Sequence, residues 1–261
     1  MIRGRDGWFV YNKYDSYIGR ALETYGEYCQ SEAQMLLQLV RPNDCVVEVG
    51  ANIGSHTVGL ANAVGPGGKV IAIEPQRVVH QLLCANMALN SIVWADCVHA
   101  AAGSANGIVL MPDIDYGQEG NFGGVSIEPG SQGQPVPMIA LDTRLDVKSL
   151  RLLKVDVEGM EQAVLQGAAE LIRKFQPILY IENDRLDRSE ALIRLIQEFN
   201  YDCYWHLPFL FNPDNWLGAK VNLFPGTVSS NMLCVSKAAD ANINGLQKIV
   251  DPEHHPLRGL A

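Results

Sequence analysis

The sequence has little of what builds disulfide frameworks, zinc clusters or membrane spans. Its six cysteines include no CxxC pair, and its six histidines include no HExxH spacing, so neither a disulfide framework nor a zinc site is indicated. We interpret His254 and His255, adjacent near the end of the chain, as surface histidines. No apolar run approaches the roughly 18 residues that span a bilayer, and the first residues lack the apolar core of a signal peptide. We therefore expect a cytoplasmic protein without a membrane partner.

An excess of basic residues is also missing. Lysine and arginine number 20 against 29 aspartates and glutamates, which gives a formal net charge of −9. A general attraction to phosphate backbones is therefore absent, and no local basic patch replaces it, so we expect no nucleic-acid partner. With 261 residues, 48% of them hydrophobic, the chain is large enough for a substantial core. One α/β domain with additions is the expected architecture.

Short apolar segments rich in β-branched residues alternate with segments of helical periodicity. This alternation predicts parallel strands joined by crossover helices. The expected strands cover residues 45–49, 70–73, 92–100, 152–157 and 178–181, with two last strands at 201–206 and 228–235. The expected helices cover residues 31–40, 55–64, 78–90, 160–174 and 189–199.

Residues 103–137 differ in composition from the segments on either side. They contain eight glycines and four prolines, interrupted by strand-like segments at 108–111 and 125–127. This composition predicts an insertion that carries a β-hairpin. We thus divide the chain into an N-terminal helical segment (1–40), a main domain (41–237) containing the insertion, and a weakly patterned tail (238–261) with a poorly ordered end.

A glycine-bearing turn follows the first expected strand. Gly50 and Gly54 lack Cβ atoms, so a nucleotide-like ligand can approach the backbone at the point where such sheets bind ligands. Glu74 closes the next strand, where a carboxylate accepts hydrogen bonds from ribose hydroxyls. A pyrophosphate needs glycine at the second position of the turn, but Asn52 stands there. These residues favour S-adenosylmethionine, whose positive sulfonium suits Glu48, over a dinucleotide.

Four segments, in order, resemble the FkbM family of methyltransferases: VEVGANIG at 47–54, IEP at 73–75, NFGG at 121–124 and KVDVEG at 154–159. YGEY at 25–28 is similar to the segment that precedes the first strand in this family. The resemblance implies a class I Rossmann-like methyltransferase with a seven-stranded, mostly parallel sheet, helices on both faces and the hairpin insertion. It also implies O-methylation of a sugar, glycan or secondary metabolite. Two alternatives stay open, an NAD-dependent oxidoreductase on the same sheet and a catalytically inactive donor-binding scaffold.

The site residues follow from the turn, from the strand ends and from the resemblance. Donor contacts are expected from Glu48, Gly50, Asn52, Gly54, His56, Thr57, Glu74, Pro75, Ala101 and Asp156. The catalytic candidates are Asp156, the first choice as general base, then Glu182, with His206 and Lys154 behind them. Acceptor contacts are expected from Tyr25, Glu27, Asn121, Phe122, Glu158 and Trp205.

Plainer roles remain open for several of these residues. Glu158 is equally compatible with capping the helix that begins near Gly159, and Lys154 with a structural ion pair. A divalent metal on Asp156, Glu182 and Asn183 is possible but not favoured. The expected partner is a small-molecule or glycan acceptor, and a homodimer is compatible with the sequence.

Overall fold

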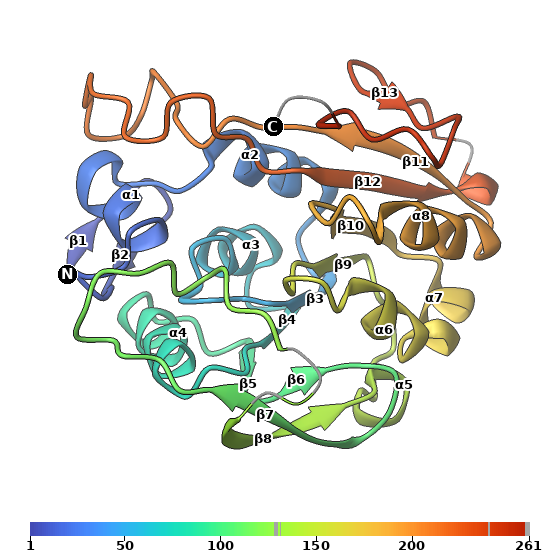
Figure 1. The fold of residues 1–261 in the computed structure, drawn as a ribbon, viewed down its shortest axis with the longest axis horizontal. Coiled ribbons are helices and arrows are strands. Elements are labelled where there is room, and N and C mark those ends of the chain that lie inside the picture. The colour runs from blue at the N-terminus through green and yellow to red at the C-terminus, as the bar shows by residue number, and fades with distance from the viewer. Residues whose placement is uncertain (128–129, 131, 240, 259–261) are drawn as a thin grey trace.

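A central β-sheet with helices on both faces forms the body of the protein (Figure 1). The computed structural model describes residues 1–127, 130, 132–239 and 241–258. Among these residues the sheet has eight strands, in the spatial order β13 (Gln247–Lys248), β11 (Tyr201–His206), β12 (Asn231–Ser236), β10 (Ile178–Glu182), β9 (Leu152–Val155), β3 (Cys45–Val49), β4 (Lys69–Ile73) and β5 (Ala95–Val98). The five strands from β10 to β5 are parallel, and the other three are antiparallel. The α/β architecture is confirmed, with one strand more than the seven expected.

The strands are apolar on both faces because helices cover both. Val47 and Val49 of β3 pack into one core with residues of the helices that follow β9 and β10. Val46, the residue before Val47, packs into a second core on the opposite face. The helices are α1 (Ile18–Tyr25), α2 (Gln30–Leu39), α3 (Thr57–Val64) and α4 (Arg77–Leu89) against the second core, and α5 (Leu141–Arg144), α6 (Glu161–Gln166), α7 (Ala169–Phe175) and α8 (Ser189–Glu198) against the first. A 3-10 turn, η1 (Lys237–Ala239), follows β12.

The N-terminal residues are tied to the turn after β3 through one buried side chain. Strands β1 (Ile2–Arg3) and β2 (Trp8–Phe9) form a small antiparallel pair. Asn86 of α4 accepts a hydrogen bond from the Val10 amide at 2.7 Å. Its carboxamide nitrogen donates to the carbonyls of Val10 and Ile53, at 3.1 and 2.7 Å. Asn86 therefore connects the start of the chain to the glycine-bearing turn.

The insertion contains a three-stranded sheet, but one expected strand is wrong. Strand β7 (Gly107–Pro112) pairs with β8 (Gly133–Ile139), which pairs in turn with β6 (Ala101–Ala102). Residues 125–127, expected as the second strand, have no regular secondary structure. Strand β8 was not expected because it contains Pro135 and Pro137, and proline is disfavoured within strands. β6 pairs only with Met138 and Ile139, so around Pro135 and Pro137 the strand β8 has an open side that tolerates a missing N–H group.

The helix expected over 160–174 is divided into α6 and α7. The break lies at Gly167, where a Cβ atom would stand 2.0 Å from the carbonyl oxygen of Gly103. This close approach requires glycine. Asp142 then accepts hydrogen bonds from the amides of Glu170 and Leu171, which begin α7. The break in the helix thus lies where Gly167 packs against Gly103, at the start of the insertion.

The expectation of a poorly ordered tail is wrong for residues 247–255. Strand β13 pairs with β11, and His255 is buried, with its Nε2 atom 2.8 Å from the carbonyl oxygen of Asn183. His255 is therefore not a surface histidine, because Trp205 and Asn183 enclose it. Within the part of the chain that is described, no helix is long and apolar enough to cross a membrane.

Candidate active site

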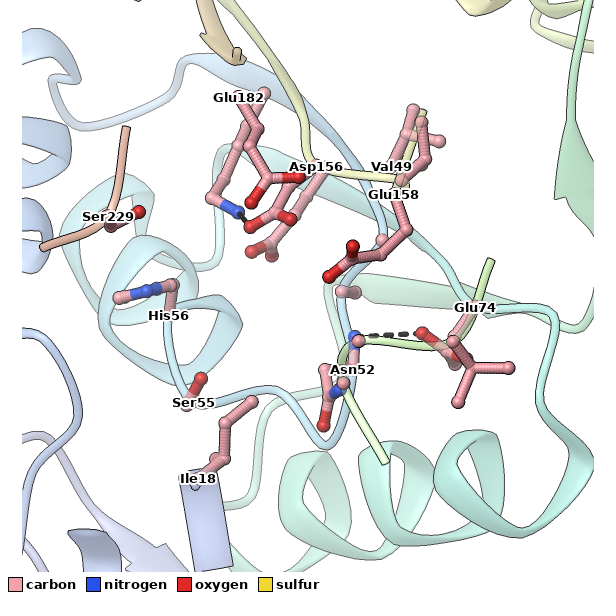
Figure 2. A pocket seen from close by; sticks show the side chains of 18 of the residues that line it. Ile18, Val49, Asn52, Ser55, His56, Glu74, Asp156, Glu158, Glu182 and Ser229 are labelled. Carbon is pink, nitrogen blue, oxygen red and sulfur yellow. Dashed lines mark hydrogen bonds and ion pairs between the residues drawn. The ribbon is translucent and has the colours of Figure 1, made fainter. Parts of the chain in front are cut away.

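The C-terminal ends of the parallel strands surround a cavity of about 310 Å³. Its walls come from the segments that follow β3, β4, β9 and β10, the place where open α/β sheets bind ligands. Helix α1, the start of α2 and residues 227–230 before β12 complete the enclosure, together with residues 121–127 of the insertion. Figure 2 shows the side chains of Asp156, Glu158 and Glu182 on one side of this space and His56 on another.

The turn after β3 is shaped by its glycines. Gly50 has a φ of +81°, and a Cβ atom there would lie 1.7 Å from the carbonyl oxygen of Asp156. Only glycine allows the end of β3 to approach the end of β9 this closely. Asn52 also has a positive φ, of +50°, and its side-chain oxygen accepts a hydrogen bond from the Ile53 amide at 2.8 Å. The turn is therefore held in one conformation at the cavity wall.

Glu74, at the end of β4, is fixed by two backbone amides. Its carboxylate oxygens accept a hydrogen bond from the amide of Asn52 at 3.0 Å (Figure 2) and another from the amide of Gln76 at 2.8 Å. The side chain is buried, and burial raises its pKa to about 7 although both amides oppose that shift. Each oxygen keeps a second lone pair for a ligand hydroxyl. Glu74 is thus oriented before any ligand binds.

A buried lysine lies at the base of the cavity among three acids. The Nζ atom of Lys154 lies 2.9 Å from Oδ2 of Asp156 and 3.7 Å from Oε1 of Glu32. Burial opposes the charge of Lys154, but Asp156, Glu32 and Glu48 outweigh it and raise its pKa. Burial also works against the charge of Asp156, yet Lys154 prevails and lowers that pKa. Lys154 and Asp156 therefore form a charged pair at neutral pH.

Glu48 and His56 lie beside this pair. Oε2 of Glu48 accepts a hydrogen bond from Oγ1 of Thr57 at 2.6 Å, and burial raises the pKa of Glu48 to about 7. Burial and the nearby Lys154 lower the pKa of His56 to about 3, so its imidazole is neutral. Its Nε2 atom lies 3.6 Å from Oε1 of Glu32. This end of the cavity thus holds one cation among several acids.

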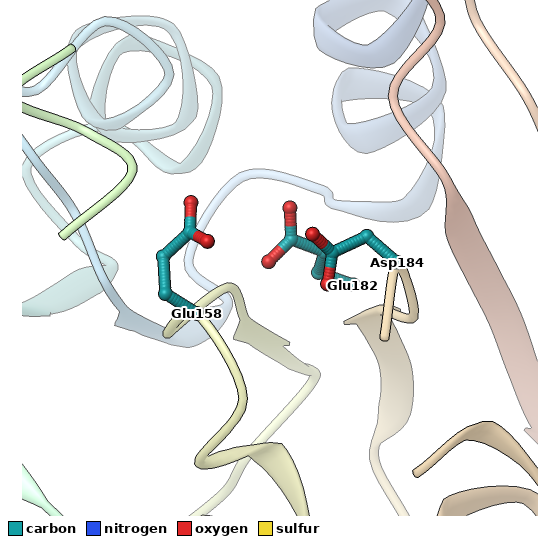
Figure 3. Close-up of side chains that lie close together, drawn as sticks. All are labelled: Glu158, Glu182 and Asp184. Atoms are coloured by element: carbon teal, nitrogen blue, oxygen red, sulfur yellow. The ribbon is translucent and has the colours of Figure 1, made fainter. Parts of the chain in front are cut away.

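Glu158, Glu182 and Asp184 form a second group of acids (Figure 3). Carboxylate oxygens of Glu158, Glu182 and Asp184 approach within 4.8 Å of one another, which is close enough to hold a divalent cation. Arg185 already supplies positive charge there, since its guanidinium lies 2.6 Å from Glu158 and 3.4 Å from Asp184. Burial, followed by the charges of Asp156 and Asp184, raises the pKa of Glu158 to about 7. Burial and the same neighbouring acids raise the pKa of Glu182 well above its usual value.

Comparison with known protein families gives one match over the part of the chain that contains the cavity-lining strand ends. A model described as the methyltransferase FkbM domain matches residues 48–203, more than half of the chain. The chain belongs to the FkbM family of S-adenosylmethionine-dependent methyltransferases. No curated protein matches the sequence at a significant level. The family match favours the methyl donor over the dinucleotide alternative.

Solved structures share the fold of this FkbM domain at low identity. The precorrin-6y C5,15-methyltransferase of Geobacter metallireducens GS-15 is 11% identical with a TM-score of 0.50, over 79% of this chain and 89% of that one. An FkbM methyltransferase of Methylobacillus flagellatus KT is 19% identical with a TM-score of 0.47, over 78% of this chain. The match spans only 50% of the Methylobacillus protein. O-methyltransferase TomG of Streptomyces achromogenes, solved in complex with SAM, is 14% identical with a TM-score of 0.45, over 79% of each chain.

Most of the residues expected to contact donor or acceptor line the cavity of this FkbM domain. The lining residues among them are Glu48, Gly50, Asn52, His56, Glu74, Pro75, Ala101, Asn121, Lys154, Asp156, Glu158 and Glu182. Thr57 acts from behind by orienting Glu48, and Gly54 packs against Leu83 of α4. Glu158 does not cap α6. The N-cap residue Met160 makes no side-chain cap bond either. Glu161, the first residue of α6, accepts hydrogen bonds from the amides of Val157 and Gly159, which precede the helix.

Other expected residues lie outside the cavity. Tyr25 and Glu27 hold the segment after β11: Tyr25 bonds to Val221 and Leu223, and Glu27 accepts hydrogen bonds from Asn212 and Trp216. Phe122 is buried against Tyr116. Asn183, expected as a metal ligand, is buried, and its side chain donates instead to Ser189 and Met232.

Trp205 and His206 also point away from the cavity. Trp205 belongs to the hydrophobic core, and Nδ1 of His206 lies 2.7 Å from the Tyr180 hydroxyl. Both residues line a separate groove on the outside of the sheet edge. His206, a catalytic candidate behind Asp156 and Glu182, is therefore not among the residues that line the cavity.

Sequence reasoning missed Glu32, Arg185 and the segment 227–230. Glu32 could have been predicted from the sequence, because it lies one turn from Leu36 on the apolar face of α2, where a charged residue needs a buried partner. That partner is Lys154. Residues 227–230 have no sequence pattern that predicts their place at the cavity, since the long connection between β11 and β12 brings them there.

Proposed function

We propose that this chain transfers a methyl group from S-adenosylmethionine to a hydroxyl oxygen of a small molecule or glycan. The observation that carries the proposal is Glu158, a cavity carboxyl whose pKa is raised to about 7 beside the ends of β9 and β10. An aliphatic hydroxyl needs a base to become a good nucleophile, and a base works best when its pKa lies near the working pH. Glu158 meets that requirement.

The charges of the cavity suit a positively charged donor. Its described lining contains seven carboxyl side chains, those of Glu32, Glu48, Glu74, Asp156, Glu158, Glu182 and Asp184, and one lysine, Lys154. When bound, S-adenosylmethionine supplies an activated methyl group on a positively charged sulfur. Glu74, fixed by two amides, is placed to accept hydrogen bonds from ribose hydroxyls, and the Gly50 turn leaves room beside it. The same acidity disfavours phosphate-bearing acceptors, so we propose an uncharged or cationic acceptor and no nucleic-acid partner.

The other acids have different tasks. Asp156 is held as a carboxylate by Lys154, which makes it a weak base but a fixed hydrogen-bond acceptor for the substrate. Burial and the neighbouring acids raise the pKa of Glu182 well above its usual value, which favours the protonated carboxyl, a group that can donate one hydrogen bond as well as accept. We therefore assign proton removal to Glu158 and positioning to Asp156, in place of the order expected from the sequence.

Calorimetry tests the donor part of the proposal. S-adenosylhomocysteine, the demethylated donor, should bind the full chain, and Glu74→Gln should weaken binding by about tenfold because a charged hydrogen bond to the ribose is lost. Glu170→Gln, an exposed change on α7, serves as the matched control and should leave binding unchanged. Absence of binding to both S-adenosylmethionine and S-adenosylhomocysteine would remove the basis for the proposal.

Product analysis tests the acceptor part. With a library of hydroxylated and amine-bearing compounds, mass spectrometry should locate the new methyl group on oxygen. Glu158→Gln should lower kcat by about 10² to 10⁴ while donor affinity is retained, and it should abolish a rise of kcat with pH near 7. Methylation exclusively on nitrogen, or an unchanged pH profile in Glu158→Gln, contradicts the assignment.

A further inference from the structure

An open groove of about 650 Å³ lies outside the donor cavity, and one segment separates the two. In residues 209–211 the side chains alternate, so Leu210 lines the cavity while Phe209 and Phe211 line the groove. The opposite side of the groove is the start of α2, with Gln30, Ser31 and Gln34. The groove and the cavity therefore share a wall that is one strip of backbone thick.

The lining of the groove is uncharged, unlike the acidic cavity. In a chain in which 19% of residues are charged, no Asp, Glu, Lys or Arg is found among the described residues that line the groove. Carboxamides of Gln30, Gln34 and Asn212 lie with the aromatic rings of Phe209 and Phe211 instead. Phe209 is 61% exposed, which is a large apolar surface to leave in water.

One polar atom in the groove lacks a partner. Gln30 is only 4% exposed, and its Oε1 atom makes no hydrogen bond with any residue that the structure describes. A buried acceptor without a donor costs about 1–3 kcal/mol. A ligand that brings a hydroxyl or amide donor into the groove would remove this cost. Gln30, one of the lining residues of the groove, thus has one unsatisfied acceptor.

We propose that this groove binds a neutral saccharide segment of the acceptor, an inference that rests on the proposed function as a methyltransferase acting on a glycan. A sugar ring presents apolar C–H faces and a rim of hydroxyls. Aromatic rings pack against the faces, and carboxamides, which both donate and accept, satisfy the hydroxyls. Charged side chains, which an anionic glycan would need, are missing from the described lining. Because Leu210 lines the cavity while Phe209 and Phe211 line the groove, a saccharide segment bound in the groove would lie beside the cavity.

Binding to an array of neutral, sialylated and sulfated oligosaccharides tests this inference without any methyl donor. The full chain should bind neutral oligosaccharides, and Phe209→Ala should weaken that binding at least about tenfold, since burial of a phenylalanine is lost. Trp8→Ala, a change at a 41% exposed aromatic residue away from the groove, is the matched control and should bind normally. Binding to no neutral oligosaccharide, preference for anionic glycans or for peptides, or normal binding by Phe209→Ala each overturns the inference.

Gln30→Leu provides a second, independent measurement. It should weaken saccharide binding about fivefold, the loss of one hydrogen bond, while the thermal stability of the free protein stays equal or rises. A fall in stability together with unchanged binding contradicts the role given to Oε1. Failure is also distinguishable from failure of the proposed function: donor binding without saccharide binding rejects the groove alone, and saccharide binding without donor binding rejects the methyl transfer and the acceptor role.

Discussion

Replacement of Gly50 by alanine should damage both stability and donor binding, because two costs coincide at that position. A φ of +81° costs a residue with a side chain about 1–2 kcal/mol. The new Cβ atom would also lie 1.7 Å from the carbonyl oxygen of Asp156, so the turn or the end of β9 has to move, at a further cost of about 1–3 kcal/mol. The free energy of unfolding should therefore fall by about 2–5 kcal/mol.

Urea denaturation measures this loss, and Gly218→Ala isolates its first part. Gly218 has a φ of +70°, but a Cβ atom there has no neighbour within 4 Å, so only the backbone cost of about 1–2 kcal/mol applies. Calorimetry with S-adenosylhomocysteine should show weak or no binding for Gly50→Ala and normal binding for Gly218→Ala. Equal unfolding free energies for the two variants, with donor binding intact in both, would refute the reasoning from close approach.

Three other changes follow from the buried charges and hydrogen bonds. Lys154→Met leaves the surrounding carboxylates without their cation and should lower the unfolding free energy by about 3–5 kcal/mol, whereas the exposed Lys148→Met should not. Glu48 and Glu74 have pKa values raised from 4.5 to about 7, so they bind protons more tightly in the folded chain. Their contribution to stability is complete below about pH 4.5 and is lost as the pH rises through 7. Urea titrations at several pH values should therefore show the free energy of unfolding falling as the pH rises through this range. The fall should be smaller in Glu48→Gln. Tyr25→Phe removes the bonds to Val221 and Leu223, and hydrogen exchange at Leu223 should accelerate about fivefold or more.

The parallel strands could be predicted because the composition of each short segment was enough to indicate a strand. Residues 45–49 and 201–206 were expected as strands with the bounds that β3 and β11 have, since short buried β-branched or aromatic runs favour few alternatives. Strand β8 escaped prediction because its prolines are tolerated only where β6 stops pairing, which depends on a neighbour distant in the sequence. The break at Gly167 likewise depends on contact with Gly103.

The cavity residues that directly follow strands were easier to predict than those that other segments contribute. Gly50, Glu74 and Asp156 lie directly after strands, so topology alone brings them to one edge of the sheet. Their protonation depends on burial and on neighbours. Lys154 lowers the pKa of Asp156 against the effect of burial, and burial followed by the surrounding acids raises the pKa of Glu158 to about 7. Tyr25 and Trp205 are aromatic residues near the site in sequence terms, but packing directs both side chains elsewhere.

The hydrogen bonds of Asn86 limit where the chain can be shortened or altered without disturbing the cavity. One carboxamide grips Val10 on one side and Ile53 of the donor turn on the other. Trimming the protein to residues 48–203, the range of the family match, would release that grip and also remove Glu32 and Ser229 from the cavity wall. The range of the family match is therefore smaller than the set of residues that form the cavity, and a deletion near residue 10 removes a contact that supports the turn after β3.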